Sequence, residues 1–130
     1  MGNTATRVNK VGSVIIPVAD QDKLIDFYVN AIGLEKRSDT PFGGDYRWVE
    51  VAPAGAETVI ALAPPPPGGS SGNTQTGIAL ETTDIDAYHA ELRSKNVDVD
   101  AEIMRMGDPV PPMFWFRDPE GNTLLVVEIR

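Results

Sequence analysis

The pattern of hydrophobic and polar positions in the first half of the chain predicts a strand, a helix and three further strands. Asp20 is predicted to cap the helix, in which apolar residues from Leu24 to Ile32 recur at helical spacing, and Gly33 ends it. A Pro-Ala-Gly turn separates the last two strands, which is typical of a hairpin. The predicted strands cover residues 11–18, 34–39, 46–51 and 58–62.

The second half of the chain repeats this order of elements. Thr83 or Asp84 is predicted to cap a helix that carries Ile85, Tyr88 and Leu92 on one face. A Pro-Glu-Gly turn at residues 119–121 separates the last two strands, as the turn at 53–55 does in the first half. The predicted strands cover residues 76–80, 97–103, 113–116 and 123–129.

The repeat predicts an α+β fold of two tandem β-α-β-β-β modules. We expect one domain over residues 1–130, made of a module at 10–63, a linker at 64–74 that begins with four prolines, and a module at 75–130. The sheets are predicted to be curved and mostly antiparallel. One helix covers only one face of a four-stranded sheet, so the uncovered faces are predicted to form a concave cleft.

Composition narrows the class of protein. The 130 residues include no cysteine, which excludes disulfides and thiolate metal sites. Eleven basic and nineteen acidic side chains give a net charge of −8, which argues against nucleic acid as a partner and mildly favours cationic ligands. No apolar run has the length of a signal peptide or membrane span, so we expect no membrane partner and a cytoplasmic location. Gly2 and Thr6 match a myristoylation pattern that short sequences often meet by chance.

Two motifs carry a resemblance to a known family. The segment VIIPVADQDKLIDFYVNAIGLE in the first module and FWFRDPEGNTLLVVE in the second resemble the vicinal oxygen chelate superfamily. This superfamily includes glyoxalase I, bleomycin-resistance proteins, fosfomycin-resistance transferases and extradiol dioxygenases. The resemblance covers about residues 10–130 and implies the fold more firmly than the function, because the scaffold hosts isomerases, transferases, oxygenases and binding proteins.

The resemblance also implies where a metal would be bound. The four ligand positions of the metal enzymes fall on Ser13, Ala61, Gly77 and Leu125. Three of these residues have no side-chain donor, and Ser13 is at best a weak neutral oxygen donor. We therefore expect no metal and no cofactor. The single histidine, His89, is expected to be a partly exposed helix residue on the side of the sheet away from the cleft.

Strand alternation suggests which side chains line the cleft. The candidate ligand-binding residues are Ser13, Tyr46, Trp48, Glu50, Met113, Trp115 and Arg117. Aligning the modules on their Pro-x-Gly turns, however, pairs Trp48 with Phe114 and Glu50 with Phe116, which leaves the direction of Trp48 open between core and cleft. Residues of two turn-rich segments, Phe42, Arg105 and Met106, are candidates for the rim.

Two functions are consistent with this site. In the first, a metal-independent protein binds a small aromatic or cationic compound, with tryptophans stacking on planar rings. In the second, a metal-free isomerase, lyase or transferase uses Glu50 as the candidate catalytic base and Arg117 or Arg105 to hold an anionic substrate. A salt bridge from Glu50 to Arg47 or Arg117 is the alternative role for that carboxylate. Unpaired sheet edges favour a homodimer in either case.

Overall fold

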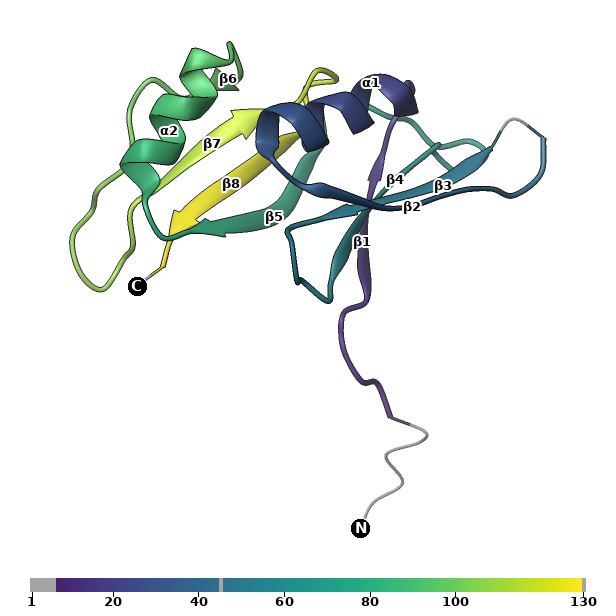
Figure 1. Cartoon of the computed structure of the whole chain (residues 1–130), viewed down its shortest axis with the longest axis horizontal. Coiled ribbons are helices and arrows are strands. Elements are labelled where there is room, and N and C mark those ends of the chain that lie inside the picture. The colour runs from purple at the N-terminus through teal and green to yellow at the C-terminus, as the bar shows by residue number, and fades with distance from the viewer. Residues whose placement is uncertain (1–6, 45, 130) are drawn as a thin grey trace.

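The computed structural model describes residues 7–44 and 46–129 and confirms the α+β fold, with two four-stranded sheets and two helical segments (Figure 1). The first half contains β1 (Ser13–Pro17), α1 (Gln21–Asp26), the π-helical turn η2 (Phe27–Ile32), β2 (Glu35–Pro41), β3 (Arg47–Ala52) and β4 (Val59–Ala63). The second half contains β5 (Gln75–Thr82), α2 (Ile85–Ser94), β6 (Asp98–Val99), β7 (Met113–Arg117) and β8 (Thr123–Glu128).

Both sheets have the same strand order. The first runs β1-β4-β3-β2 and the second β5-β8-β7-β6. The first strand of each module pairs in parallel with the last, β1 with β4 and β5 with β8, and the other pairs are antiparallel. The sheets are therefore mostly antiparallel, and β1 and β5 each form one edge of a sheet.

Both helical segments begin at an aspartate cap, and the first one ends at a glycine. Asp20 accepts a hydrogen bond from the backbone N–H of Lys23 at 3.1 Å, and Gly33 ends η2 at φ 96°, a conformation that glycine adopts without strain. In the second module Asp84, rather than Thr83, is the capping residue; it accepts from the N–H of Ala87 at 3.1 Å. No helix in the described part of the chain is long and apolar enough to cross a membrane.

The two modules share one hydrophobic core. The helices lie together on one side of the sheets, above them in Figure 1. The ring of Phe27 on η2 contacts Phe116 of the second sheet, with centroids 6.2 Å apart. The largest fully buried apolar side chains come from both halves and include Ile16, Leu24, Val49, Leu62, Ile85, Leu92, Phe114 and Phe116.

The sixth strand is much shorter than predicted. Only Asp98–Val99 pairs with β7, although the pattern predicted a strand over 97–103. Asp98 and Asp100 are both ion-paired with Arg117 across the strands, and beyond Asp100 the chain leaves the sheet. Met104 returns to β7 through an isolated bridge. Apolar residues in a loop that packs on the sheet thus produced the signal of a longer strand.

The first strand is also shorter than predicted. It begins at Ser13 rather than Val11, and residues 7–12 extend from it as an exposed arm that points away from the body of the molecule (Figure 1). The arm is attached at its base, where the Thr58 hydroxyl donates to the Val11 carbonyl at 2.6 Å. The Gly2 and Thr6 pattern lies outside the described residues.

Candidate functional site

The uncovered face of the first sheet carries Trp48 and Glu50. On β3, Val49 and Val51 are fully buried under the helices, so the residues that alternate with them point to the opposite face. Glu50 lies beside Ala61 in the strand register. The structure thus decides the direction of Trp48, which lies on the concave face and not in the core.

The conflict in the turn-based alignment has a simple geometric cause. The core-facing pair across the hairpin is Val51 with Ile60 in the first module and Phe116 with Leu124 in the second. The connection between the paired residues is one residue longer in the first module. Aligning the modules on their turns therefore shifts one strand by one position, which reverses every side chain in it.

An aromatic cluster lies on this face, and one of its rings binds the Glu50 carboxylate. Phe42 contacts Tyr46 at a centroid distance of 5.7 Å and Trp48 at 6.4 Å, the latter edge to face. The indole N–H of Trp48 donates to the Glu50 carboxylate at 2.8 Å. Glu50 is therefore held by Trp48 and by neither of the arginines considered from the sequence. Ser13 is exposed at the start of β1 on the same sheet.

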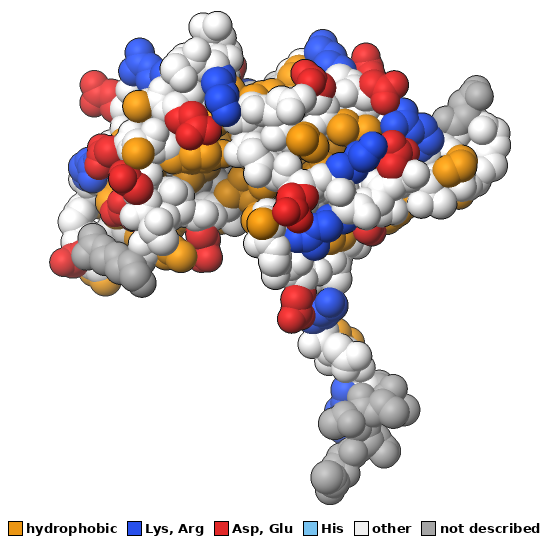
Figure 2. Space-filling model, viewed as in Figure 1, with side chains coloured by type: hydrophobic (Ala, Val, Ile, Leu, Met, Phe, Trp, Pro, Cys, Tyr) orange, Lys and Arg blue, Asp and Glu red, His pale blue; other side chains and the backbone are white. Residues whose placement is uncertain are grey.

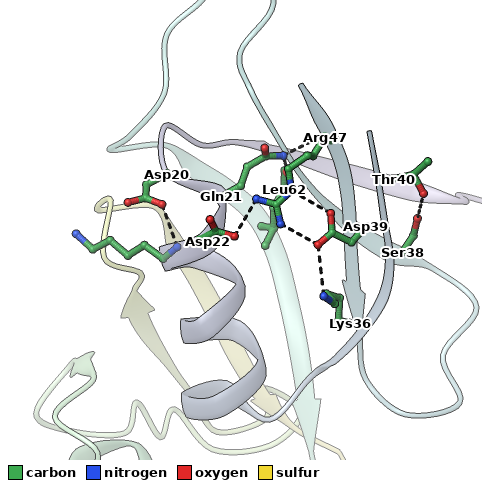
Figure 3. Close-up of polar contacts among 10 residues, drawn as sticks. Asp20, Gln21, Asp22, Lys36, Ser38, Asp39, Thr40, Arg47 and Leu62 are labelled. Carbon is green, nitrogen blue, oxygen red and sulfur yellow. Dashed lines mark hydrogen bonds and ion pairs between the residues drawn. The ribbon is translucent and has the colours of Figure 1, made fainter. Parts of the chain in front are cut away.

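A polar network on the helix side of the same sheet fixes β2, β3 and β4 to the start of α1 (Figure 3). The Arg47 guanidinium donates to Asp39 at 2.8 and 3.0 Å and to Asp22 at 2.8 Å. The Gln21 amide donates to the carbonyls of Arg47 at 2.7 Å and Leu62 at 2.8 Å. The hydrogen bonds from Arg47 lower the pKa of Asp39 from 3.8 to about 2. The strand that presents Trp48 is thus held in place at its first residue.

The uncovered face of the second sheet carries the other three candidates. Phe114 and Phe116 are fully buried on β7, and Met113, Trp115 and Arg117 alternate with them on the opposite side. Their side chains are only partly buried. The uncovered face of the second sheet therefore carries a tryptophan and a methionine on the same strand, β7.

Both arginines that were candidates for holding an anion are already paired. Arg117 donates to Asp98 and to Asp100, each at 2.9 Å, and its hydrogen bond lowers the pKa of Asp98. Arg105 pairs with Asp86 on α2 at 2.6 Å. A negatively charged substrate would have to displace a carboxylate from either guanidinium.

The structure does not bring the two candidate sets together within one chain. Tyr46, Trp48 and Glu50 belong to the first sheet and Met113, Trp115 and Arg117 to the second. Among the described residues, no hydrogen bond or ring contact joins the two sets. Met106, on the loop before β7, is exposed. The helices and shared core lie behind both sheets, so each concave face is open to solvent.

The side chains at the family's metal positions do not fit a metal ion. Ala61, Gly77 and Leu125 have no donor atom, and Ser13 is a neutral hydroxyl. Within residues 7–44 and 46–129, no three His, Cys, Asp or Glu side chains form a group that could hold one. The chemistry of these four side chains therefore does not suit a divalent cation.

His89 lies away from both concave faces, as expected, but it is buried rather than partly exposed. Its Nε2 atom is 2.8 Å from the carbonyl oxygen of Asp100, and its ring meets Phe114 edge to face at 4.8 Å. The imidazole fills the space between α2 and the second sheet and satisfies a loop carbonyl. The spacing of apolar residues in this helix did not show that the chain at Asp100 would contact the imidazole.

The Asp-Pro-Glu-Gly-Asn turn joins the two modules. The buried Asp118 carboxylate accepts from the Tyr28 hydroxyl at 2.8 Å and the Asn122 amide at 2.9 Å, and also from the N–H groups of Glu120 and Asn122. The Glu120 carboxylate accepts from the N–H of Ala19 at 2.9 Å, in front of α1. Burial, and then the charge of Asp118, raise the pKa of Tyr28. Sequence analysis identified this motif only as a marker of the family.

The fold, the paired modules and this turn agree with the result of the family comparison. The family model for the Glyoxalase/Bleomycin resistance protein/Dioxygenase superfamily matches residues 10–126, nearly the whole chain. The chain belongs to this superfamily. The resemblance inferred from the two sequence motifs is thereby confirmed.

Several known proteins are similar to this chain along nearly the full length of both. The antibiotic-binding protein TnmS3 from Streptomyces sp. CB03234 is 34% identical, with a TM-score of 0.82, and the alignment covers 95% of this chain and 98% of that one. A superfamily member from Sphaerobacter thermophilus DSM 20745 is 38% identical, with a TM-score of 0.85 and coverage of 94% and 98%. The protein YetH of Bacillus subtilis (strain 168) is 29% identical over 93% of this chain and 99% of its own length.

Proposed function

We propose that this protein binds a small aromatic or cationic compound without a metal, as a single domain of two modules. The observation that carries the proposal is the surface formed by Phe42, Tyr46, Trp48 and Glu50. The rings of Phe42 and Tyr46 are exposed, Phe42 contacts the partly buried Trp48, and the Trp48 indole N–H positions the Glu50 carboxylate. Aromatic faces attract planar and cationic groups, and the carboxylate supplies a hydrogen-bond acceptor of the matching charge. The net charge of −8 adds long-range attraction for cations.

Similarity to TnmS3 supports the same proposal. TnmS3 is an antibiotic-binding protein, and its fold and one third of its residues match this chain over nearly the full length of both. Planar ring systems are common among antibiotics, and the ligand we propose is of that kind. The side chains at Ser13, Ala61, Gly77 and Leu125 leave a small, mostly uncharged floor where metal enzymes of the superfamily hold an ion.

The enzymatic alternative receives less support from the contacts. In this alternative Arg117 or Arg105 would hold the anionic substrate, but both guanidinium groups bind aspartates. Glu50 would be the general base, and one of its oxygens already accepts the Trp48 N–H. Binding requires only that this carboxylate remain an acceptor, which the observed hydrogen bond allows.

We further propose that the complete cleft forms in a homodimer. The shared core directs the concave faces of both sheets away from it, so neither face closes over a ligand alone. A two-fold axis sets the first face of one copy against the second face of its partner and produces two equal clefts. Each cleft then contains Trp48 and Glu50 from one chain with Trp115 and Met113 of the other, and a planar compound can stack between two indoles.

Tryptophan fluorescence provides the test. The protein is titrated with acriflavine as a planar cation, with fluorescein as a planar anion, and with a panel of planar cationic antibiotics. We expect quenching by the cations and much weaker binding of the anion. A flat response to the whole panel would contradict the proposal.

Matched variants locate the site. We expect E50Q to weaken cation binding about fivefold to tenfold, because a charge-assisted contact becomes neutral. W48F should remove the share of the quenching that Trp48 contributes and leave the share of Trp115. E57Q removes the same charge from an exposed position outside the aromatic cluster and should bind like the parent protein. Equal affinities for E50Q and E57Q would exclude Glu50 from the site.

A further inference from the structure

Two hydroxyl groups lie on the same face of the first sheet as Trp48 and Glu50. In the register of β2 with β3, Ser38 is directly opposite Glu50 and Thr40 is directly opposite Trp48. Residues opposite each other in a sheet carry their side chains on the same face, with Cβ atoms about 5 Å apart. The two hydroxyl oxygens are 3.4 Å apart. Figure 3 shows them facing each other on β2, whereas Asp39, between them in sequence, points to the opposite side of the strand.

Ser38 is the polar neighbour of Glu50 in a row of side chains that crosses the whole sheet. The strand registers pair Ser38 with Glu50, Glu50 with Ala61, and Ala61 with Ile15. The last two members of the row are apolar, and Ile15 is largely exposed. Glu50 therefore has a hydroxyl group on one side and aliphatic groups on the other.

The Glu50 carboxylate has an oxygen available for a ligand. Trp48 donates to its Oε2 atom at 2.8 Å, and the described residues form no other hydrogen bond to this carboxylate. No buried side-chain oxygen or nitrogen in the described part of the chain lacks a partner, so the Oε1 atom reaches solvent. The half-buried Ser38 hydroxyl has only its long contact with Thr40 and retains lone pairs. Two hydrogen-bond acceptors thus lie next to the Trp48 ring.

Basic side chains near these acceptors in sequence are bound elsewhere. Arg37 donates to the carbonyls of Pro53 at 2.6 Å and Ala56 at 2.9 Å and pairs with Glu35. Arg47 binds two aspartates on the helix side of the sheet. The charge of the carboxylate is therefore available to a cation. Figure 2 shows acidic side chains on both halves of the molecule, and the net charge of −8 adds attraction at long range.

We infer that the ligand carries a primary ammonium group, which donates hydrogen bonds to Glu50 Oε1 and to the Ser38 hydroxyl while an attached planar ring lies on Trp48. The inference rests on the ligand function proposed above and names the class of cation. A primary ammonium has three N–H donors, whereas a quaternary ammonium has none and offers charge alone. Residues two apart on a strand are separated by roughly 7 Å, so a short linker between ring and ammonium is sufficient.

A matched pair of probes tests the class of cation. Anthracenylmethylamine carries a primary ammonium at neutral pH, and its trimethylammonium derivative has the same ring and charge without N–H donors. We expect the parent protein to bind the primary ammonium about tenfold more tightly, because only this probe forms charge-assisted hydrogen bonds. Fluorescence titration measures both dissociation constants. Equal constants would overturn the inference.

A pair of serine variants tests the second acceptor. S38A removes the hydroxyl beside Glu50, and S70A removes an exposed hydroxyl of the linker, outside both sheets. We expect S38A to weaken binding of the primary ammonium about fivefold and binding of the trimethylammonium probe less than about twofold. Retained binding of the second probe also shows that S38A is folded. The same preference for the primary ammonium in S38A and S70A would exclude Ser38 from the site.

The glutamate variants separate this inference from the proposed ligand function. E50Q should weaken binding of both probes, because both carry the charge, and E57Q should weaken neither. If the parent binds both probes equally and E50Q weakens both, the ligand function stands and the ammonium assignment falls. If neither probe binds the parent, or if E50Q and E57Q bind both probes alike, the ligand site and the ammonium assignment both fall.

Discussion

At the scale of single residues, alternation along β3 separates two charged side chains that the sequence places close together. Arg47 and Glu50 are three positions apart, an odd number, so they point to opposite faces of the strand and do not pair. Arg47 binds Asp39 and Asp22 beside the helix, and Glu50 binds Trp48 on the concave face. One short strand thus supplies both a structural ion-pair network and a candidate ligand surface.

The Asp39–Arg47 pair predicts a response to acid. The pKa of Asp39 is lowered from 3.8 to about 2, so the pair contributes its full stability above pH 3.8 and loses it as the pH falls towards 2. In R47Q the pKa of Asp39 should return most of the way to 3.8, and Lys36 at 3.4 Å should keep it slightly lower. NMR titration of the Asp39 carboxyl carbon measures both values. An unchanged pKa in R47Q would show that Arg47 is not the cause.

At the scale of elements, the irregular backbone path of β5 depends on one glycine. Gly77 has φ +74° inside the strand, at the point where the register with β8 shifts between Gln75 and Ala79. Side chains other than glycine are strained in this conformation. The glycine therefore allows the bulge.

Substituting this glycine tests the strain directly. A Cβ added at Gly77 or at Gly12 would meet no atom within 4 Å, but only Gly77 has a positive φ. We expect G77A to lower the free energy of unfolding by about 1–2 kcal/mol, and G12A to change it by less than about 0.5 kcal/mol or to stabilise the protein. Urea unfolding of both variants measures the difference. Equal changes in the free energy of unfolding would show that the positive φ at Gly77 does not strain other side chains.

The turn after β7 is the second element with a specific role, because it ties the second module to the first. We expect D118A to lower the free energy of unfolding by about 3 kcal/mol or more, since buried donors that include the Tyr28 hydroxyl lose their acceptor. D86A removes an exposed carboxylate from its pair with Arg105 and should cost less than about 1 kcal/mol. Chemical unfolding curves give both values, and similar losses would contradict a joining role for Asp118.

At the scale of the whole molecule, the shared core determines where a ligand can bind. Helices and core lie behind both sheets, so the two aromatic faces are open and separate in one chain. A second copy is the simplest way to enclose them, and exposed apolar residues such as Val11 and Ile15 lie along the surface that it would cover. The proposed ligand cleft depends on this arrangement.

A homodimer predicts a thermal stability that depends on protein concentration. Folding coupled to association raises the melting temperature as protein concentration rises, by mass action. We expect an increase across a hundredfold range of concentration for the parent protein. Differential scanning calorimetry measures it. A melting temperature independent of concentration, in a protein that sediments as a monomer, would contradict the dimer.

The sequence by itself determined the elements, their repeated order and the family, because periodicity, capping residues and turn residues are local properties. It also determined that the family's metal positions lack strong donors. Only the tertiary structure decided which face Trp48 occupies, because a one-residue difference in loop length reverses a strand. Tertiary structure alone likewise buried His89, paired Arg117 with two aspartates and separated the two aromatic faces. These features depend on contacts between segments distant in sequence, which local patterns do not specify.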